Sequence, residues 1–217
     1  MLLATLACLA GMAMAVLKTS PSGPAAPLPP ATSTTGTVTL TERQALEALL
    51  LPSADNMAWI LARWDAGSQA AFVARMNAAA RRLGMTDTSY TDPSGLDPST
   101  VSTAVDQVRL GMEAMRVPAL AAIAAKPAAV VPVAGLVRNY NTLLGQDGIA
   151  GLKTGSMHAA GGCVLLTAWH QAGGRSTLVV AATFGQPGTA QTILPNALNA
   201  GHALVLALDH ALGHRRH

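Results

Sequence analysis

The strongest constraint on the fold is a change of hydrophobic pattern at Pro127. Before this proline, apolar residues recur at helical spacing, as at Phe72, Met76, Ala79 and Leu83. After it, the apolar residues form short runs separated by Gly-rich or polar turns, a pattern typical of antiparallel strands. The sequence therefore predicts an α+β protein in which a helical subdomain precedes an antiparallel sheet.

Each helix expected before Pro127 has its own start or stop signal. Thr41 is followed three residues later by Gln44, which is a capping-box pattern, and the helix that begins there should end before Pro52. Residues 91–100 are turn-forming types and should separate the third helix from the fourth. The later helices are expected over 56–64, from Ser68 to Gly84, and from Ser102 or Thr103 to Pro118.

The part of the chain after Pro127 predicts a meander of short strands and one long helix. The strands are expected over 128–134, 149–154, 161–169 and 177–184. The Ala- and Leu-rich stretch 189–212 should form a terminal helix that lies flat on the sheet.

The N-terminal segment 1–18 is open to three interpretations. Residues 1–17 contain no charged side chain, and Lys18 ends the run. A signal peptide with a small-residue site at 13–15, an uncleaved membrane anchor and a buried core helix all fit this pattern. The Pro-, Ser- and Thr-rich residues 19–39 are expected to be a linker, followed by a folded domain over 40–212.

Composition excludes several classes of function. Only 12% of the residues are charged and 3% are aromatic, and the net charge of +3 is spread along the chain. Nucleic-acid binding, which needs a basic patch or stacking aromatic residues, is therefore not expected. Cys8 and Cys163 lie too far apart in the sequence to form a metal knuckle. Neither a disulfide framework, nor a metal site, nor a cofactor is predicted.

The triplet Lys153-Thr154-Gly155 is the clearest candidate for chemistry. It lies on one of the expected strands. On an edge strand, the ammonium of Lys153 would attract a peptide carboxylate and the hydroxyl of Thr154 would add a directed hydrogen bond. Gly155 would leave room for close approach of the ligand to the backbone. The triplet alone is a weak signal because such triplets occur often by chance.

Upstream motifs strengthen this interpretation. Ser53 and Asp55 lie in a Pro-marked loop just ahead of an expected helix, and the turn-rich segment 91–100 follows before the triplet. In this order, the motifs resemble those of the serine D-alanyl-D-alanine carboxypeptidases, penicillin-binding enzymes of the β-lactamase and transpeptidase fold. The resemblance covers residues 40–185 almost continuously.

The resemblance implies roles for individual residues. In the family, a Ser-x-x-Lys helix, a Ser-x-Asn loop and a Lys-Thr-Gly strand meet in one cleft. Ser53 matches the serine of the second motif, and Ser53 and Asp55 are the catalytic candidates. Lys153, Thr154 and Gly155 match the third motif and are the substrate-binding candidates. We therefore expect Ser53 and Lys153 to lie close together in space.

Two departures from the family pattern affect the chemistry. Asp55 stands where the second motif has Asn, and an ionised carboxylate accepts hydrogen bonds but cannot donate them. The first motif, Ser-x-x-Lys, does not occur anywhere in the 217 residues. If the segment before Lys18 is a remnant of that helix, Leu6 and Leu9 occupy the positions of the nucleophile and the base, and neither side chain can perform that chemistry.

The resemblance implies a D-alanyl-D-alanine carboxypeptidase that acts on peptidoglycan stem peptides through a serine acyl-enzyme, without a cofactor. The implied partners are the D-Ala-D-Ala end of the stem peptide and β-lactams, with the anchor interpretation of 1–17 adding a membrane. Such a protein acts outside the cytoplasm, in the cell wall or at the membrane. The alternative is a catalytically inactive relative that binds muropeptide ends.

Overall fold

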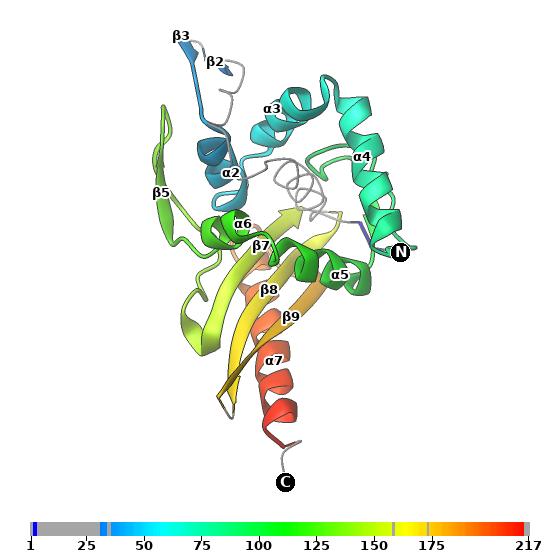
Figure 1. Ribbon diagram of the computed structural model, residues 1–217, viewed down its shortest axis with the longest axis vertical. Coiled ribbons are helices and arrows are strands. Elements are labelled where there is room, and N and C mark those ends of the chain that lie inside the picture. Colours follow the sequence, from blue (N-terminus) through cyan, green and yellow to red (C-terminus); the bar gives the residue numbers. More distant parts are fainter. Residues whose placement is uncertain (1, 4–30, 34–35, 158, 173, 215–217) are drawn as a thin grey trace.

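A three-stranded antiparallel sheet forms the centre of the protein (Figure 1). The computed structural model describes residues 2–3, 31–33, 36–157, 159–172 and 174–214. The sheet consists, in spatial order, of β7 (Ile149–Met157), β8 (Gly161–Ala172) and β9 (Arg175–Gln186). These strands confirm the last part of the predicted meander, and they leave β7 with one edge unpaired by the strands of this sheet.

Helices cover both faces of the sheet. Consecutive residues of β8 are apolar, and because successive side chains of a strand point to opposite faces, both faces of β8 are apolar. The terminal helix α7 (Ile193–His214) packs on the face of Val164 and Leu166, whose side chains approach Gly201 of this helix. On the other face, Leu165 approaches α5 (Ala104–Ala114) at Gly111. The short helix α6 (Pro118–Ala124) lies against β7. The predicted terminal helix on the sheet is thus confirmed.

The helical subdomain contains α2 (Glu42–Leu50), α3 (Asp55–Ala66) and α4 (Gln69–Arg82). Thr41 and Gln44 form the predicted capping box at the start of α2. Ser68 caps α4 by accepting a hydrogen bond from the backbone N–H of Ala71. The three helices lie above one end of the sheet in Figure 1, where α2 adjoins α6.

Two predicted elements end earlier than expected. The fourth helix stops at Ala114, capped at its start by Thr103, and a new helix, α6, begins with Pro118 as its first residue, a position that suits proline because no backbone N–H is needed there. The strand predicted over 128–134 does not join the meander. Instead β5 (Ala128–Val131) and β6 (Gly135–Arg138) form a separate hairpin, and β5 ends before Pro132, which cannot donate to a ladder.

Two short strand pairs involve the N-terminal part of the chain. β1 (Leu2–Leu3) pairs with β4 (Val101–Ser102), and β2 (Ala31–Ser33) pairs with β3 (Gly36–Val38) inside the predicted linker. Apart from β1, the segment 1–18 lies outside the described residues, and so do its three interpretations. None of the helices in the described part of the chain is long and apolar enough to cross a membrane.

We predict that Gly162→Ala destabilises the contact between β8 and α7. A Cβ at this position would lie 2.3 Å from the carbonyl oxygen of Ile193 and 2.9 Å from the Cβ of Ala197. Because the nearest obstacle is backbone, the helix itself must shift, and we expect a loss of about 2 kcal/mol in the free energy of unfolding, measured by urea denaturation. As a control, Ala203→Leu enlarges an exposed position of α7 and should have little effect. Equal stabilities of wild type and Gly162→Ala would contradict this packing.

Candidate active site

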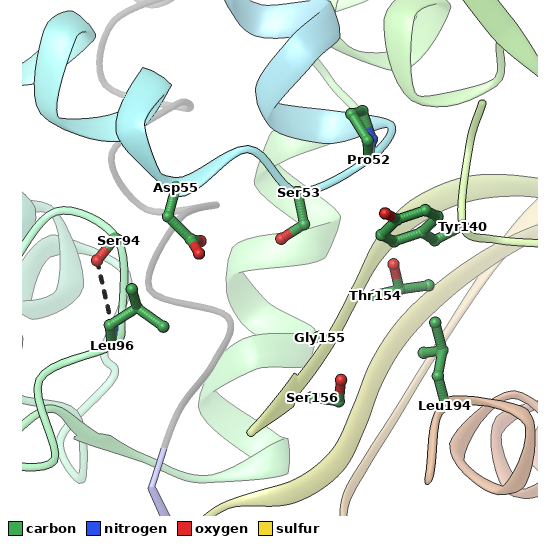
Figure 2. A pocket seen from close by; sticks show the side chains of 10 residues that line it. All are labelled: Pro52, Ser53, Asp55, Ser94, Leu96, Tyr140, Thr154, Gly155, Ser156 and Leu194. Atoms are coloured by element: carbon green, nitrogen blue, oxygen red, sulfur yellow. Dashed lines mark hydrogen bonds between the residues drawn. The ribbon is translucent and has the colours of Figure 1, made fainter. Parts of the chain in front are cut away.

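Ser53 lies in the loop that connects α2 to α3, in a left-handed backbone conformation with φ of 59°. The loop is held at both ends: the backbone N–H of Ala54 donates to the carbonyl of Ala48, and the carbonyl of Leu51 accepts from the N–H of Tyr140. This conformation costs free energy for a residue with a Cβ. In Figure 2 the Ser53 hydroxyl lies on the side of the loop that faces Asp55.

Lys153 approaches Ser53 from the edge strand β7. Its Nζ donates to the Ser53 Oγ over 2.7 Å and to the carbonyl of Thr154 over 2.5 Å. The Lys153 residue is only 1% exposed, so these bonds replace water around the ammonium. The predicted approach of Ser53 and Lys153, which are 100 positions apart in the sequence, is confirmed.

A cavity of about 200 Å³ opens beside this pair. Both predicted motifs contribute to it, and the side chains of Ser53, Asp55 and Thr154 converge on it in Figure 2. Its described lining consists of Pro52, Ser53, Asp55, Ser94, Leu96, Tyr140, Thr154, Gly155, Ser156 and Leu194. The mixture of hydroxyls, one carboxyl group and a few apolar side chains suits a small polar ligand such as a peptide end.

Asp55, the first residue of α3, is the acidic group of the cavity. Burial raises the pKa of its carboxyl group, Lys153 counteracts this effect, and the negative charge of Asp92 adds to the rise. The carboxyl group therefore takes up a proton at a higher pH than an exposed aspartate does. Asp55 and Lys153 supply opposite charges to the same site.

The loop 91–100 forms a second wall of the cavity. The buried Asp92 carboxylate accepts hydrogen bonds from the hydroxyl of Ser94 and from the backbone N–H groups of Ser94, Gly95 and Leu96. This arrangement agrees with the turn-building role expected of Asp92 and Ser94. The sequence did not indicate that the loop would place Ser94 and Leu96 in the cavity.

Tyr140 is a third part of the wall that sequence reasoning missed. The asparagines on either side hold its loop: the Asn139 side chain donates to the carbonyls of Ala124 and Lys126, and the Asn141 side chain donates to the carbonyl of Gly151. The Tyr140 residue itself remains 49% exposed. An asparagine on each side of an aromatic residue was the signal in the sequence that could have indicated this anchored loop.

Histidine, cysteine and carboxylate side chains are those that could bind a metal ion or take part in chemistry at the cavity. Within the described residues, no group of three His, Cys, Asp or Glu side chains is placed to hold a metal ion. Cys163 is fully buried in β8. His158, which follows the Lys153 triplet in the sequence, lies outside the described residues.

Comparison with models of known protein families identifies the family of this chain. A family model described as D-alanyl-D-alanine carboxypeptidase matches residues 33–185. The chain belongs to this family. The match begins inside the segment predicted as a linker and includes both Ser53 and the Lys153 triplet.

Individual curated proteins, a carboxypeptidase and an endopeptidase, are similar to part of this chain. One from Mycobacterium tuberculosis is 43% identical over 127 residues, which are 55% of this chain and 43% of that protein. A D-alanyl-D-alanine endopeptidase from Pseudomonas aeruginosa is 35% identical over 134 residues, which are 58% of this chain and 43% of that protein. The chain thus matches about half the length of these curated relatives.

Solved structures confirm the α+β fold expected for the family. A Streptomyces DD-transpeptidase superposes with a TM-score of 0.77 at 22% identity, covering 97% of this chain and 88% of that chain. A penicillin-binding protein from Listeria monocytogenes in its ampicillin-bound form gives a TM-score of 0.72 at 26% identity, covering 93% and 87% of the two chains. The antiparallel sheet with its packed terminal helix is therefore the family architecture.

The structure brings together every candidate residue of the second and third family motifs. Ser53, Asp55, Thr154 and Gly155 line the cavity, and the buried Lys153 is hydrogen-bonded to Ser53. The positions compared with the first motif, Leu6 and Leu9, lie outside the described residues. The described site therefore contains the substrate-binding candidates and the second-motif serine.

We predict that Ser53→Gly is more stable than Ser53→Ala. Both changes remove the hydrogen bond from Lys153, but only glycine adopts a φ of 59° without steric cost, so the difference should be about 1 kcal/mol. Thermal unfolding of the two variants measures it. At an ordinary strand or helix position alanine is the more stable residue, so that order here would contradict the observed backbone conformation.

Proposed function

We propose that the cavity between Ser53 and β7 binds the D-Ala-D-Ala end of a peptidoglycan stem peptide. The observation that carries the proposal is the 2.7 Å hydrogen bond between Lys153 and Ser53, which places two family motifs at one cavity. The edge of β7 that pairs with no other described strand offers backbone groups near the Lys153 triplet to an extended peptide. Thr154 and Ser53 supply hydroxyls, and Gly155 leaves space for the peptide backbone.

We propose that the site, when a Ser-x-x-Lys helix completes it, carries out the family activity, which is peptide-bond hydrolysis through an acyl-enzyme. A serine oxygen attacks the carbonyl carbon of the penultimate D-Ala, the bond to the terminal D-Ala breaks, and the leaving amine takes a proton. Water then releases the acyl group and restores the serine. We assign Ser53 and Asp55 to hydrogen bonding and proton transfer around these steps, and Lys153, Thr154 and Gly155 to substrate binding.

The proposed substrate places the activity outside the cytoplasm, where peptidoglycan is found. It also makes β-lactams proposed ligands of the same cavity, as ampicillin is for the Listeria penicillin-binding protein. We propose no nucleic-acid partner and no cofactor. The membrane anchor considered for residues 1–17 remains an interpretation of the sequence.

A second candidate function is binding of muropeptide ends without turnover. Acyl transfer needs a nucleophile with a base beside it, and the motif that supplies this pair in the family, Ser-x-x-Lys, does not occur in the 217 residues. Ser53 is a poor substitute: its neighbour Lys153 is hydrogen-bonded as a donor, and an approaching substrate carboxylate would hold the ammonium protonated.

We predict that the chain of 217 residues forms no stable covalent adduct with penicillin. Incubation with a fluorescent penicillin followed by denaturing electrophoresis tests this directly. A longer form that adds a Ser-x-x-Lys helix upstream serves as the positive control and should label, because it supplies the paired nucleophile and base.

Two results would contradict this prediction. A labelled band from the 217-residue chain that disappears in Ser53→Ala would identify Ser53 as the nucleophile. A band that persists in this variant would assign the reaction to another residue and would eliminate the non-catalytic candidate.

A further inference from the structure

Asp55 is the one residue with a formal charge among the described residues that line the cavity. Its neighbours in the lining are hydroxyl-bearing residues such as Thr154 and Ser156, together with apolar side chains. In Figure 2 the Asp55 carboxyl group points into the same space as the Ser53 hydroxyl. A ligand that contacts Ser53 and β7 therefore also meets Asp55.

The compensating positive charge belongs to a buried side chain. Lys153 is 1% exposed, and its ammonium already donates to the Ser53 Oγ and to the Thr154 carbonyl. A ligand carboxylate in the cavity would feel attraction from this ammonium and repulsion from Asp55 at the same time. Asp92 in the neighbouring loop adds negative charge, as its effect on the pKa of Asp55 shows.

Hydrogen-bonding chemistry points the same way. An ionised carboxylate offers only acceptors, so Asp55 is satisfied by a ligand N–H and is left opposing a ligand carboxylate oxygen. The hydroxyls of Ser53, Thr154 and Ser156 can donate or accept and do not discriminate between the two kinds of ligand. The discrimination therefore depends on Asp55.

We propose that Asp55 is a specificity-determining residue, which weakens the binding of peptide ends with a free carboxylate relative to the same ends that present an amide N–H. The proposal rests on the proposed function and narrows its substrate class. Among D-Ala-containing peptides, those whose terminal carboxyl group is amidated or joined to a further residue gain affinity relative to those that end in a free carboxylate. Protonation of Asp55 removes the discrimination, and the charged groups that act on Asp55 are Lys153 from β7 and Asp92 from the loop 91–100.

The test compares two probes that differ only at the carboxyl group, N-acetyl-D-alanyl-D-alanine and its carboxamide. Their dissociation constants are measured by calorimetry for the full chain and for Asp55→Asn, a variant of nearly identical shape without the charge. At neutral pH, Asp55→Asn should bind the free carboxylate about tenfold more tightly than wild type does, and the carboxamide with less than about a twofold change. Under acidic conditions wild type should approach Asp55→Asn, because burial raises the pKa of Asp55 and protonation begins at a higher pH than usual.

Asp97→Asn is the matched control. It removes one negative charge from the loop 91–100 without altering the lining of the cavity, and should leave the preference unchanged. Asp55→Ser provides a second uncharged variant should Asp55→Asn not fold.

The outcomes distinguish failure of the proposed role of Asp55 from failure of the proposed function. If both probes bind and the uncharged variants keep the wild-type ratio of affinities, the role of Asp55 is overturned while the proposed function stands. An equal shift in Asp97→Asn would also overturn it, because the effect would then come from overall charge. If no variant binds either probe, the proposed function fails and this inference fails with it.

Discussion

The hydrogen bond from the Lys153 ammonium to the Ser53 hydroxyl joins the helical subdomain to the edge of the sheet. An ammonium that is almost fully buried has lost most of its hydration, and fixed acceptors must replace the lost water. The loop between α2 and α3 therefore has to bring Ser53 directly over β7, in a backbone conformation that serine otherwise avoids. The cavity and the position of Asp55 both follow from this placement.

The rest of the fold holds the two partners of this bond in place. β8 is the central strand and is covered by α5 on one face and α7 on the other. β7 is an edge strand, from which Lys153 reaches Ser53 of the helical subdomain. Asn141 fastens the loop of Tyr140 to β7, while the backbone of Tyr140 fastens the end of α2. Hydrogen bonds thus hold the walls of the site together, with a buried positive charge beside Ser53 and a negative charge in the lining of the cavity.

The sequence predicted the parts of this arrangement that depend on local signals. Capping residues such as Thr41 and Ser68, the short apolar runs and the family motifs located the helices, the sheet and the meeting of Ser53 with Lys153. The strand expected over 128–134 was placed in the wrong sheet, because local pattern does not say which strand pairs with which. The roles of Leu96 and Tyr140 in the cavity also depend on tertiary packing, which turn chemistry alone does not reveal.

A double-mutant cycle in the free energy of unfolding tests the central claim, using Ser53→Ala, Lys153→Met and the double variant. If the buried bond holds the loop to β7, the two changes should be non-additive, with a coupling of about 2 kcal/mol, as expected for a hydrogen bond from a charged donor. Additivity within about 0.3 kcal/mol would contradict the account, because it would mean that Ser53 and Lys153 stabilise the protein independently.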